Sequence, residues 1–167
     1  RVSHAILVGT AYPMKVSPVL IESSLNEPLK ALKMVNVFSR ATLCSPPSVL
    51  GPGTWVYGAG MALGKRVLAS NPKVNLFHRG FVACDSYDHG LEAASAMPCP
   101  TLFVLGDGDQ MTPPKAAKGL IDAAKQSGQA VTVAKVPVGH HQMSEDPDGT
   151  LFAIRDFLAA YPDTTAA

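Results

Sequence analysis

The sequence is poor in the features that mark several classes of protein. Its three cysteines, Cys44, Cys84 and Cys99, are an odd number without the C-x-x-C spacing of zinc and redox sites. We therefore expect small buried thiols in a reducing compartment, and a cytoplasmic protein. No apolar run approaches the ~20 residues that cross a bilayer. No basic and apolar leader opens the chain either, so we expect no membrane partner.

Charge is also scarce, and neither sign dominates. Fourteen basic and thirteen acidic side chains leave a net charge of +1, and no stripe of Lys and Arg could follow a phosphate backbone. Nucleic acid is therefore not an expected partner. The content of 47% hydrophobic and 16% charged residues is typical of a soluble globular protein, and 167 residues suffice for one compact domain.

Two patterns that suggest cofactors fail on inspection. The run GAGMALGK, residues 58–65, resembles a phosphate loop, but its glycine spacing is wrong and Arg66 stands where a magnesium-binding Ser or Thr should be. Four side chains could be suggested as metal ligands: His140, His141, Asp107 and Asp109. Adjacent histidines on a turn point in different directions, however, and lack the i, i+4 spacing of helical ligand pairs. We predict no cofactor and no metal.

What the sequence does contain is a set of short apolar runs typical of buried parallel strands. They cover Ala5–Val8, Thr101–Leu105 and Val131–Val136. Each is followed by a turn and then by helical periodicity, which is the strand and helix alternation of a parallel sheet. The predicted fold class is therefore α/β.

The stretch between the first two strands is mostly helical in pattern. Its one clear interruption is CSPPSVLGPG, residues 44–53, which we expect to be the most mobile loop. An all-helical insertion between strands is typical of a lid over an active site, although a helical layer that only covers the core is the alternative. We divide the chain into residues 1–26 (first strand and connection), 27–97 (helical cap) and 98–167 (two βα units).

An acid follows the second strand and a histidine follows the third. Turns beyond the carboxyl ends of parallel strands share one edge of the sheet, so Asp109 and His140 can lie side by side. A carboxylate there can accept the ring N–H of the imidazole, fix its tautomer and stabilise the imidazolium. Strand order alone leaves open which aspartate of this turn, Asp107 or Asp109, bonds the histidine.

These two turns also resemble a known family. LGDGDQMTPPKAA, followed by VPVGHHQMSEDPDGTLFAIRDFL, resembles the C-terminal end of an α/β-hydrolase, and HAILVGTAYPMKVSP resembles the strand after its nucleophile-bearing unit. The resemblance covers nearly the whole chain. It implies about three parallel strands with flanking helices and a helical cap, with Asp109 as the acid and His140 as the base of a catalytic triad. On this resemblance we predict that Asp109 and His140 are hydrogen-bonded and that Asp107 points elsewhere.

The family's nucleophile is missing from the pattern. No G-x-S-x-G elbow occurs in the sequence, and no Cys or Asp elbow of matching shape. One hypothesis is therefore the C-terminal portion of a hydrolase that acts on a small ester, amide or related bond. Its partner would be an N-terminal nucleophile-bearing segment or a second copy of the chain, and the isolated chain would be inactive. The other hypothesis is a non-catalytic remnant or binding module of the same fold.

Five apolar side chains of the expected cap are candidates for contact with a small-molecule substrate. They could line a pocket or merely pack against one another. They are Trp55, Tyr57, Met61, Phe77 and Phe81.

Overall fold

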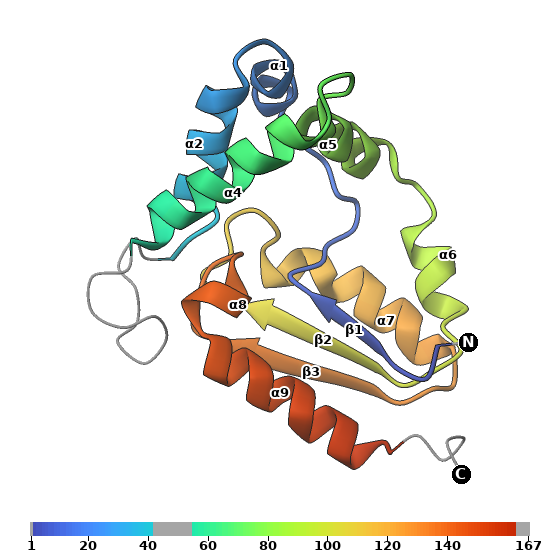
Figure 1. Ribbon diagram of the computed structural model, residues 1–167. Coiled ribbons are helices and arrows are strands. Elements are labelled where there is room, and N and C mark those ends of the chain that lie inside the picture. The colour runs from blue at the N-terminus through green and yellow to red at the C-terminus, as the bar shows by residue number, and fades with distance from the viewer. Residues whose placement is uncertain (1, 42–54, 163–167) are drawn as a thin grey trace.

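The computed structural model describes residues 2–41 and 55–162, and its centre is a parallel sheet (Figure 1). The strands are β1 (Ala5–Val8), β2 (Thr101–Gly106) and β3 (Val131–Val136), in the spatial order β1-β2-β3. Ala5 pairs with Thr101, which pairs with Val131, so all three strands begin level. The predicted α/β class and its three parallel strands are confirmed, with β2 one residue longer than expected.

The other regular elements of the described chain are helices. Four of them begin at a proline, which lacks the N–H that the first helical turn leaves unpaired: Pro18, Pro28, Pro114 and Pro147. None of the helices in the described ranges combines the length and apolar character that crossing a bilayer requires. The helical elements are α1 (Pro18–Asn26), α2 (Pro28–Phe38), α4 (Val56–Ser70), α5 (Leu76–Ser86), α6 (Gly90–Ser95), the short 3-10 helix η1 (Pro114–Ala117), α7 (Lys118–Gln126), α8 (Gln142–Glu145) and α9 (Pro147–Ala160).

Strand β2 is the core of the molecule. Its six residues are all buried, because helices cover both faces of the sheet, with α7 on one side and α9 on the other (Figure 1). Leu102 and Val104 pack with Phe157 of α9. Phe103 and Leu105 point to the opposite face and pack against α7. Burial on both faces explains why the sequence of β2 is a continuous apolar run rather than an alternating one.

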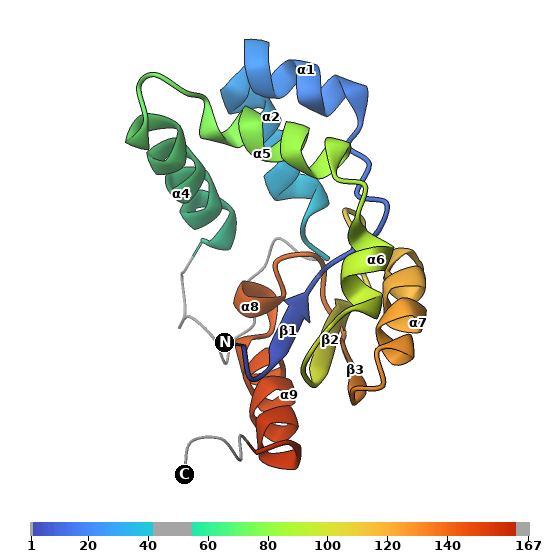
Figure 2. The same cartoon turned by 90° about the vertical axis from the view of Figure 1, so that its right-hand side faces the viewer.

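Helices α1, α2, α4 and α5 pack on one another and form a layer, which we call the helical layer. It lies beyond the end of the sheet to which the strands point (Figure 2). The described part of residues 27–97 contains no strand, as expected. The layer begins earlier than residue 27, at Pro18, and α6 packs against α7 instead. The predicted mobile loop, residues 44–53, lies outside the described residues.

Truncation of the central strand should show how much this core contributes. Leu102 is 0% exposed, so we expect Leu102→Ala to lower the free energy of unfolding by about 2–5 kcal/mol, through lost burial and the cavity left behind. Leu151 on α9 is 57% exposed and provides a matched control, for which the loss should stay within about 0.5 kcal/mol. Urea unfolding monitored by circular dichroism measures both. Equal losses would mean that β2 is not the core of the fold.

Candidate active site

The turn after β2 separates its two aspartates. The backbone N–H of Asp107 donates to Val136, which keeps the turn level with the end of β3. The Asp107 side chain is 52% exposed and pairs with Lys135 at 3.3 Å, so it points away from the site. Asp109 is instead only 4% exposed. The turn therefore directs the Asp107 carboxylate outward and the Asp109 carboxylate inward, as predicted.

Asp109 and His140 form a hydrogen-bonded pair. The distance from His140 Nδ1 to Asp109 Oδ2 is 2.9 Å, which confirms the predicted contact. The other carboxylate oxygen, Oδ1, accepts the backbone N–H groups of Met111 and Thr112, both at 2.8 Å. The side chain of His140 remains 32% exposed, whereas that of Asp109 is fully buried. Several hydrogen bonds thus hold Asp109 in place, whereas His140 is accessible to a ligand.

The surroundings of Asp109 keep it ionised. Burial is the largest single influence and works to raise the pKa of its carboxyl group. The hydrogen bonds from His140 and Thr112, with the attraction to His140, outweigh burial, so the pKa is lowered overall. A buried carboxylate that stays charged can stabilise an imidazolium beside it.

The histidine turn rests on the end of α2. The backbone N–H of His140 donates to the carbonyl oxygen of Ser39 at 2.6 Å. Glu145, which is 2% exposed, accepts the backbone N–H of Ala41 at 2.8 Å. The helical layer and the sheet therefore meet at the histidine itself, and the position of α2 helps to set the position of the imidazole.

Gln142 anchors the same turn to the end of β2. It is 1% exposed, and with its amide oriented to satisfy both bonds it donates to Val104 O at 3.1 Å and accepts from Gly106 N at 2.9 Å. The amide bonds the backbone of β2 near its end, beside Gly9, whose N–H also donates to Val104 O. The sequence does not reveal the role of Gln142, because a glutamine at the start of a short helix carries no signal of burial.

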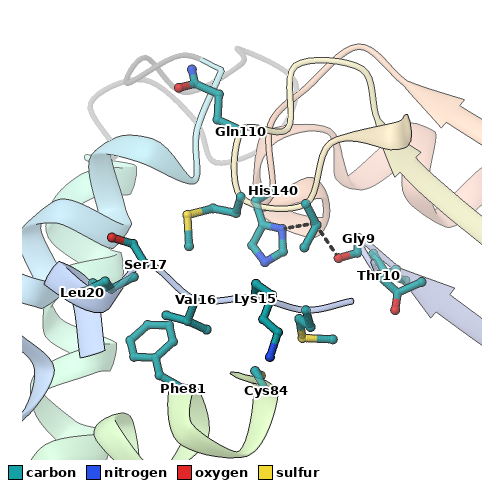
Figure 3. A pocket seen from close by; sticks show the side chains of 14 residues that line it. Gly9, Thr10, Lys15, Val16, Ser17, Leu20, Phe81, Cys84, Gln110 and His140 are labelled. Carbon is teal, nitrogen blue, oxygen red and sulfur yellow. Dashed lines mark hydrogen bonds between the residues drawn. The ribbon is translucent and has the colours of Figure 1, made fainter. Parts of the chain in front are cut away.

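A cavity of about 490 Å³ opens in front of His140 (Figure 3). The ring nitrogen of His140 that does not bond Asp109, Nε2, points into it. The wall is mainly apolar, and most of it comes from the connection after β1 and from α5. Its apolar members are Val8, Met14, Val16, Leu20, Phe81 and Met111. Its polar members include Thr10, Lys15, Ser17, Cys84, Gln110 and Thr112.

Of the five side chains expected to contact a substrate, one lies in this cavity. Phe81 is among the lining residues, and Phe77 meets it edge to face, with ring centroids 4.8 Å apart. Trp55 is 66% exposed and stacks on Tyr57. Met61 is buried against α2. These last four residues do not line the cavity, because helical periodicity predicts a helix but does not tell which of its faces meets the site.

The residues that line the cavity in their place follow β1 and Asp109 directly. Thr10, Met14 and Val16 lie in the connection from β1 to α1, at the edge of the sheet that also carries Asp109 and His140. The rule that placed the acid and the histidine at this edge could have found them, since the end of β1 lies there too.

His141 faces away from this chemistry. Its Nδ1 lies 3.1 Å from Nη2 of Arg40, which is 5% exposed. Burial first, and then the charge of Arg40, lower the pKa of His141 to about 4. This histidine therefore stays neutral at neutral pH and accepts the arginine's hydrogen bond.

Many solved structures are similar in fold to this chain, and three of them show how much of the chain the similarity covers. A thermophilic esterase is 21% identical, with a TM-score of 0.70 over 95% of this chain and 57% of its own. The esterase EaEST from Exiguobacterium antarcticum is 16% identical, with a TM-score of 0.72 over 94% of this chain and 57% of its own. The enol-lactonase from Burkholderia xenovorans LB400 is 19% identical, with a TM-score of 0.66 over 95% of this chain and 57% of its own.

The described chain has the α/β-hydrolase fold. It spans a little over half of the three structures, a share that fits the C-terminal portion of that fold. No family model and no curated protein matches the sequence. The predicted resemblance is thus confirmed at the level of the fold, while the roles of Asp109 and His140 remain predictions.

The neutral state of His141 should be visible in the pH dependence of stability. A folded pKa of about 4, below the ordinary 6.5, means that the unfolded chain takes up the proton first. The buried, neutral state of His141 therefore makes its full contribution to stability above pH 6.5, and this contribution is lost as the pH falls toward 4. We expect His141→Gln to flatten the decline of the unfolding free energy in this window. His89→Gln, whose side chain is 71% exposed, should leave the decline unchanged. Parallel curves for all three proteins would contradict the burial of a neutral His141.

The contact between α2 and the histidine turn depends on Gly139. A Cβ there would lie 2.5 Å from Ala41 N and 2.7 Å from Ser39 O, both backbone atoms. We expect Gly139→Ala to cost roughly 1–3 kcal/mol of unfolding free energy, because the turn must move away from α2. In the control Gly80→Ala the added Cβ meets nothing within 4 Å, and stability should rise by up to about 1 kcal/mol. Urea unfolding gives both values, and a neutral Gly139→Ala would show that the two segments do not dock as described.

Proposed function

We propose that this chain is the C-terminal portion of an α/β-hydrolase that cleaves a small ester, amide or related bond. The observation that carries the proposal is the Asp109–His140 pair, with the second ring nitrogen of His140 facing a cavity. In this arrangement His140 is the general base, and Asp109 orients the ring and stabilises its charged form.

The proton transfers follow from this geometry. His140 Nε2 takes the proton of a nucleophile as that group attacks the carbonyl carbon of the substrate. The same nitrogen then gives the proton to the departing alcohol or amine, which leaves the acyl group on the nucleophile. A water molecule then attacks that acyl group and gives its proton to Nε2, and the proton passes to the nucleophile as the acid is released. Asp109 keeps its charge throughout and holds the Nδ1 proton of His140. The apolar wall of the cavity suits the uncharged part of a small substrate.

The nucleophile is proposed to come from a segment outside the 167 residues. Among the described residues, no Ser, Thr or Cys side chain hydrogen-bonds Nε2 of His140, and the sequence has no G-x-S-x-G elbow. In the described structure β1 pairs with β2 alone, so its other edge offers unpaired backbone groups to another strand. The proposed occupant is an N-terminal nucleophile-bearing segment, and a second copy of the chain is the alternative.

The names of the similar structures support the substrate class without defining it. Two are esterases and one is an enol-lactonase, and all of these names describe attack on an ester-type carbonyl. At 16–21% identity they carry the fold to this chain, and the reaction stays a proposal.

The proposal predicts that activity depends on both the pair and the missing nucleophile. The isolated chain should hydrolyse p-nitrophenyl esters no faster than buffer, and co-expression with the upstream segment of its gene should restore saturable turnover. In the restored protein His140→Ala should lower kcat by at least about 10³-fold, because the base is lost. The matched control His89→Ala, at an exposed histidine directly before α6, should leave kcat unchanged.

Two outcomes would contradict parts of the proposed function. Saturable hydrolysis by the purified chain alone, abolished by His140→Ala, would show that the nucleophile lies within it. A completed protein with no turnover on esters, amides or lactones would favour the second hypothesis, a non-catalytic remnant or binding module.

A further inference from the structure

The hydroxyl group of Thr112 lies between three parts of the candidate site. Its Oγ1 is 2.8 Å from Asp109 Oδ2, 3.0 Å from His140 Nδ1 and 2.7 Å from the carbonyl oxygen of Gly9. Figure 3 draws the two hydrogen bonds that join His140 to Gly9 through this residue. The threonine therefore contacts the acid, the base and the end of β1 with a single oxygen atom.

One proton has to serve these three contacts. A carbonyl oxygen and an ionised carboxylate only accept, so the hydroxyl shares its one proton between Gly9 O and Asp109 Oδ2. The contact with His140 Nδ1 is satisfied only if Nδ1 itself carries a proton, which it shares between Thr112 Oγ1 and Asp109 Oδ2. If Nδ1 carried no proton, three acceptors (Nδ1, Gly9 O and Asp109 Oδ2) would surround the single hydroxyl proton. Thr112 thus favours the tautomer in which Nε2, the nitrogen that faces the cavity, is the free base.

Gly9, whose carbonyl oxygen accepts this bond, stands at a position that favours glycine. Its φ of +60° is a left-handed conformation that side chains rarely adopt. A Cβ at this position would lie 3.3 Å from His140 Nδ1. The imidazole and the end of β1 are therefore already in close contact, and the Thr112 hydroxyl joins them by a directed bond rather than by packing alone.

We propose that Thr112 is a positioning residue that holds the imidazole of His140 at the end of β1 and fixes its tautomer. It acts through His140 and Asp109 and does not itself react. The structural part of this inference stands on the three contacts, and its kinetic part rests on the function proposed above.

The test compares three variants with the unaltered chain. Thr112→Val keeps the shape of the side chain and removes the hydroxyl, whereas Thr112→Ser keeps the hydroxyl. Thr150→Val is the matched control, because Thr150 is also buried, lies on α9, and its hydroxyl has no hydrogen-bond partner among the described residues.

Two NMR measurements address the structural part. In the unaltered chain the Thr112 hydroxyl proton should exchange slowly and show a cross-relaxation signal to the His140 Nδ1 proton. The ¹³C titration of the Asp109 carboxylate should shift to higher pH in Thr112→Val, because a hydrogen bond that lowers its pKa is lost. Thr112→Ser should restore the midpoint, and Thr150→Val should not move it. An unmoved midpoint in Thr112→Val would overturn the proposal. If that variant does not fold, a freely exchanging hydroxyl proton in the unaltered chain would overturn it equally.

The kinetic measurement uses the chain completed by its upstream segment. We expect Thr112→Val to lower kcat about tenfold with little change in KM, since the hydroxyl is occupied by protein atoms, and Thr112→Ser to recover most of the rate. An unchanged kcat would overturn the positioning role. Absence of turnover in the unaltered completed protein would instead count against the proposed function, and the NMR result would still decide the structural part.

Discussion

Parallel pairing of β2 with both of its neighbours decides where the polar groups of this chain can meet. The three strands begin level and run in one direction, so the turns that follow them open at the same edge. Asp109 follows β2, His140 follows β3 and Gly9 follows β1. An antiparallel neighbour would send one of these turns to the opposite edge, and the 2.9 Å contact between the acid and the imidazole could not form.

The close fit at this edge explains why small residues gather there. Gly9 approaches the imidazole ring, Gly139 approaches the backbone after α2, and a Cβ at Gly106 would meet Gly139 O at 2.3 Å. Each of these positions lets one backbone segment come within contact distance of another. The site is consequently built as much from backbone atoms as from side chains, and its geometry depends on the sheet and the helical layer together.

The sequence predicted the parts of the site that follow from strand order. An acid and His140 could be placed at this edge because each follows an apolar run, and the end of a buried strand is visible in the residues themselves. The choice of Asp109 over Asp107 came from the resemblance of the turn to a family motif. Thr112 and Gln142 could not be placed. A threonine three residues after the acid, or a glutamine after two histidines, is ordinary in a surface turn until tertiary contacts show what each one bonds.

The helical layer shows a second limit of prediction from the sequence, which concerns the residues that line the cavity. Its helical character was evident from periodicity, yet Trp55, Tyr57, Met61 and Phe77 do not line the cavity, while Phe81 does. A helix presents all its faces within two turns, so its pattern identifies an apolar face without identifying what that face covers. The choice between core and cavity depends on how α4 and α5 pack against α1 and α2, which involves contacts between residues far apart in the sequence.

The position of β1 connects the structure to the proposed chemistry. Within the described residues its free edge faces away from β2, and its end at Gly9 contacts the imidazole and the Thr112 hydroxyl. A strand that paired in parallel with that edge would end level with Val8, and the turn after it would open beside Gly9. A nucleophile on such a turn would thus be positioned relative to His140 by the same backbone pairing that positions Asp109. The catalytic geometry would then follow from the register of one continuous sheet, with Thr112 linking the imidazole to the strand nearest the incoming nucleophile.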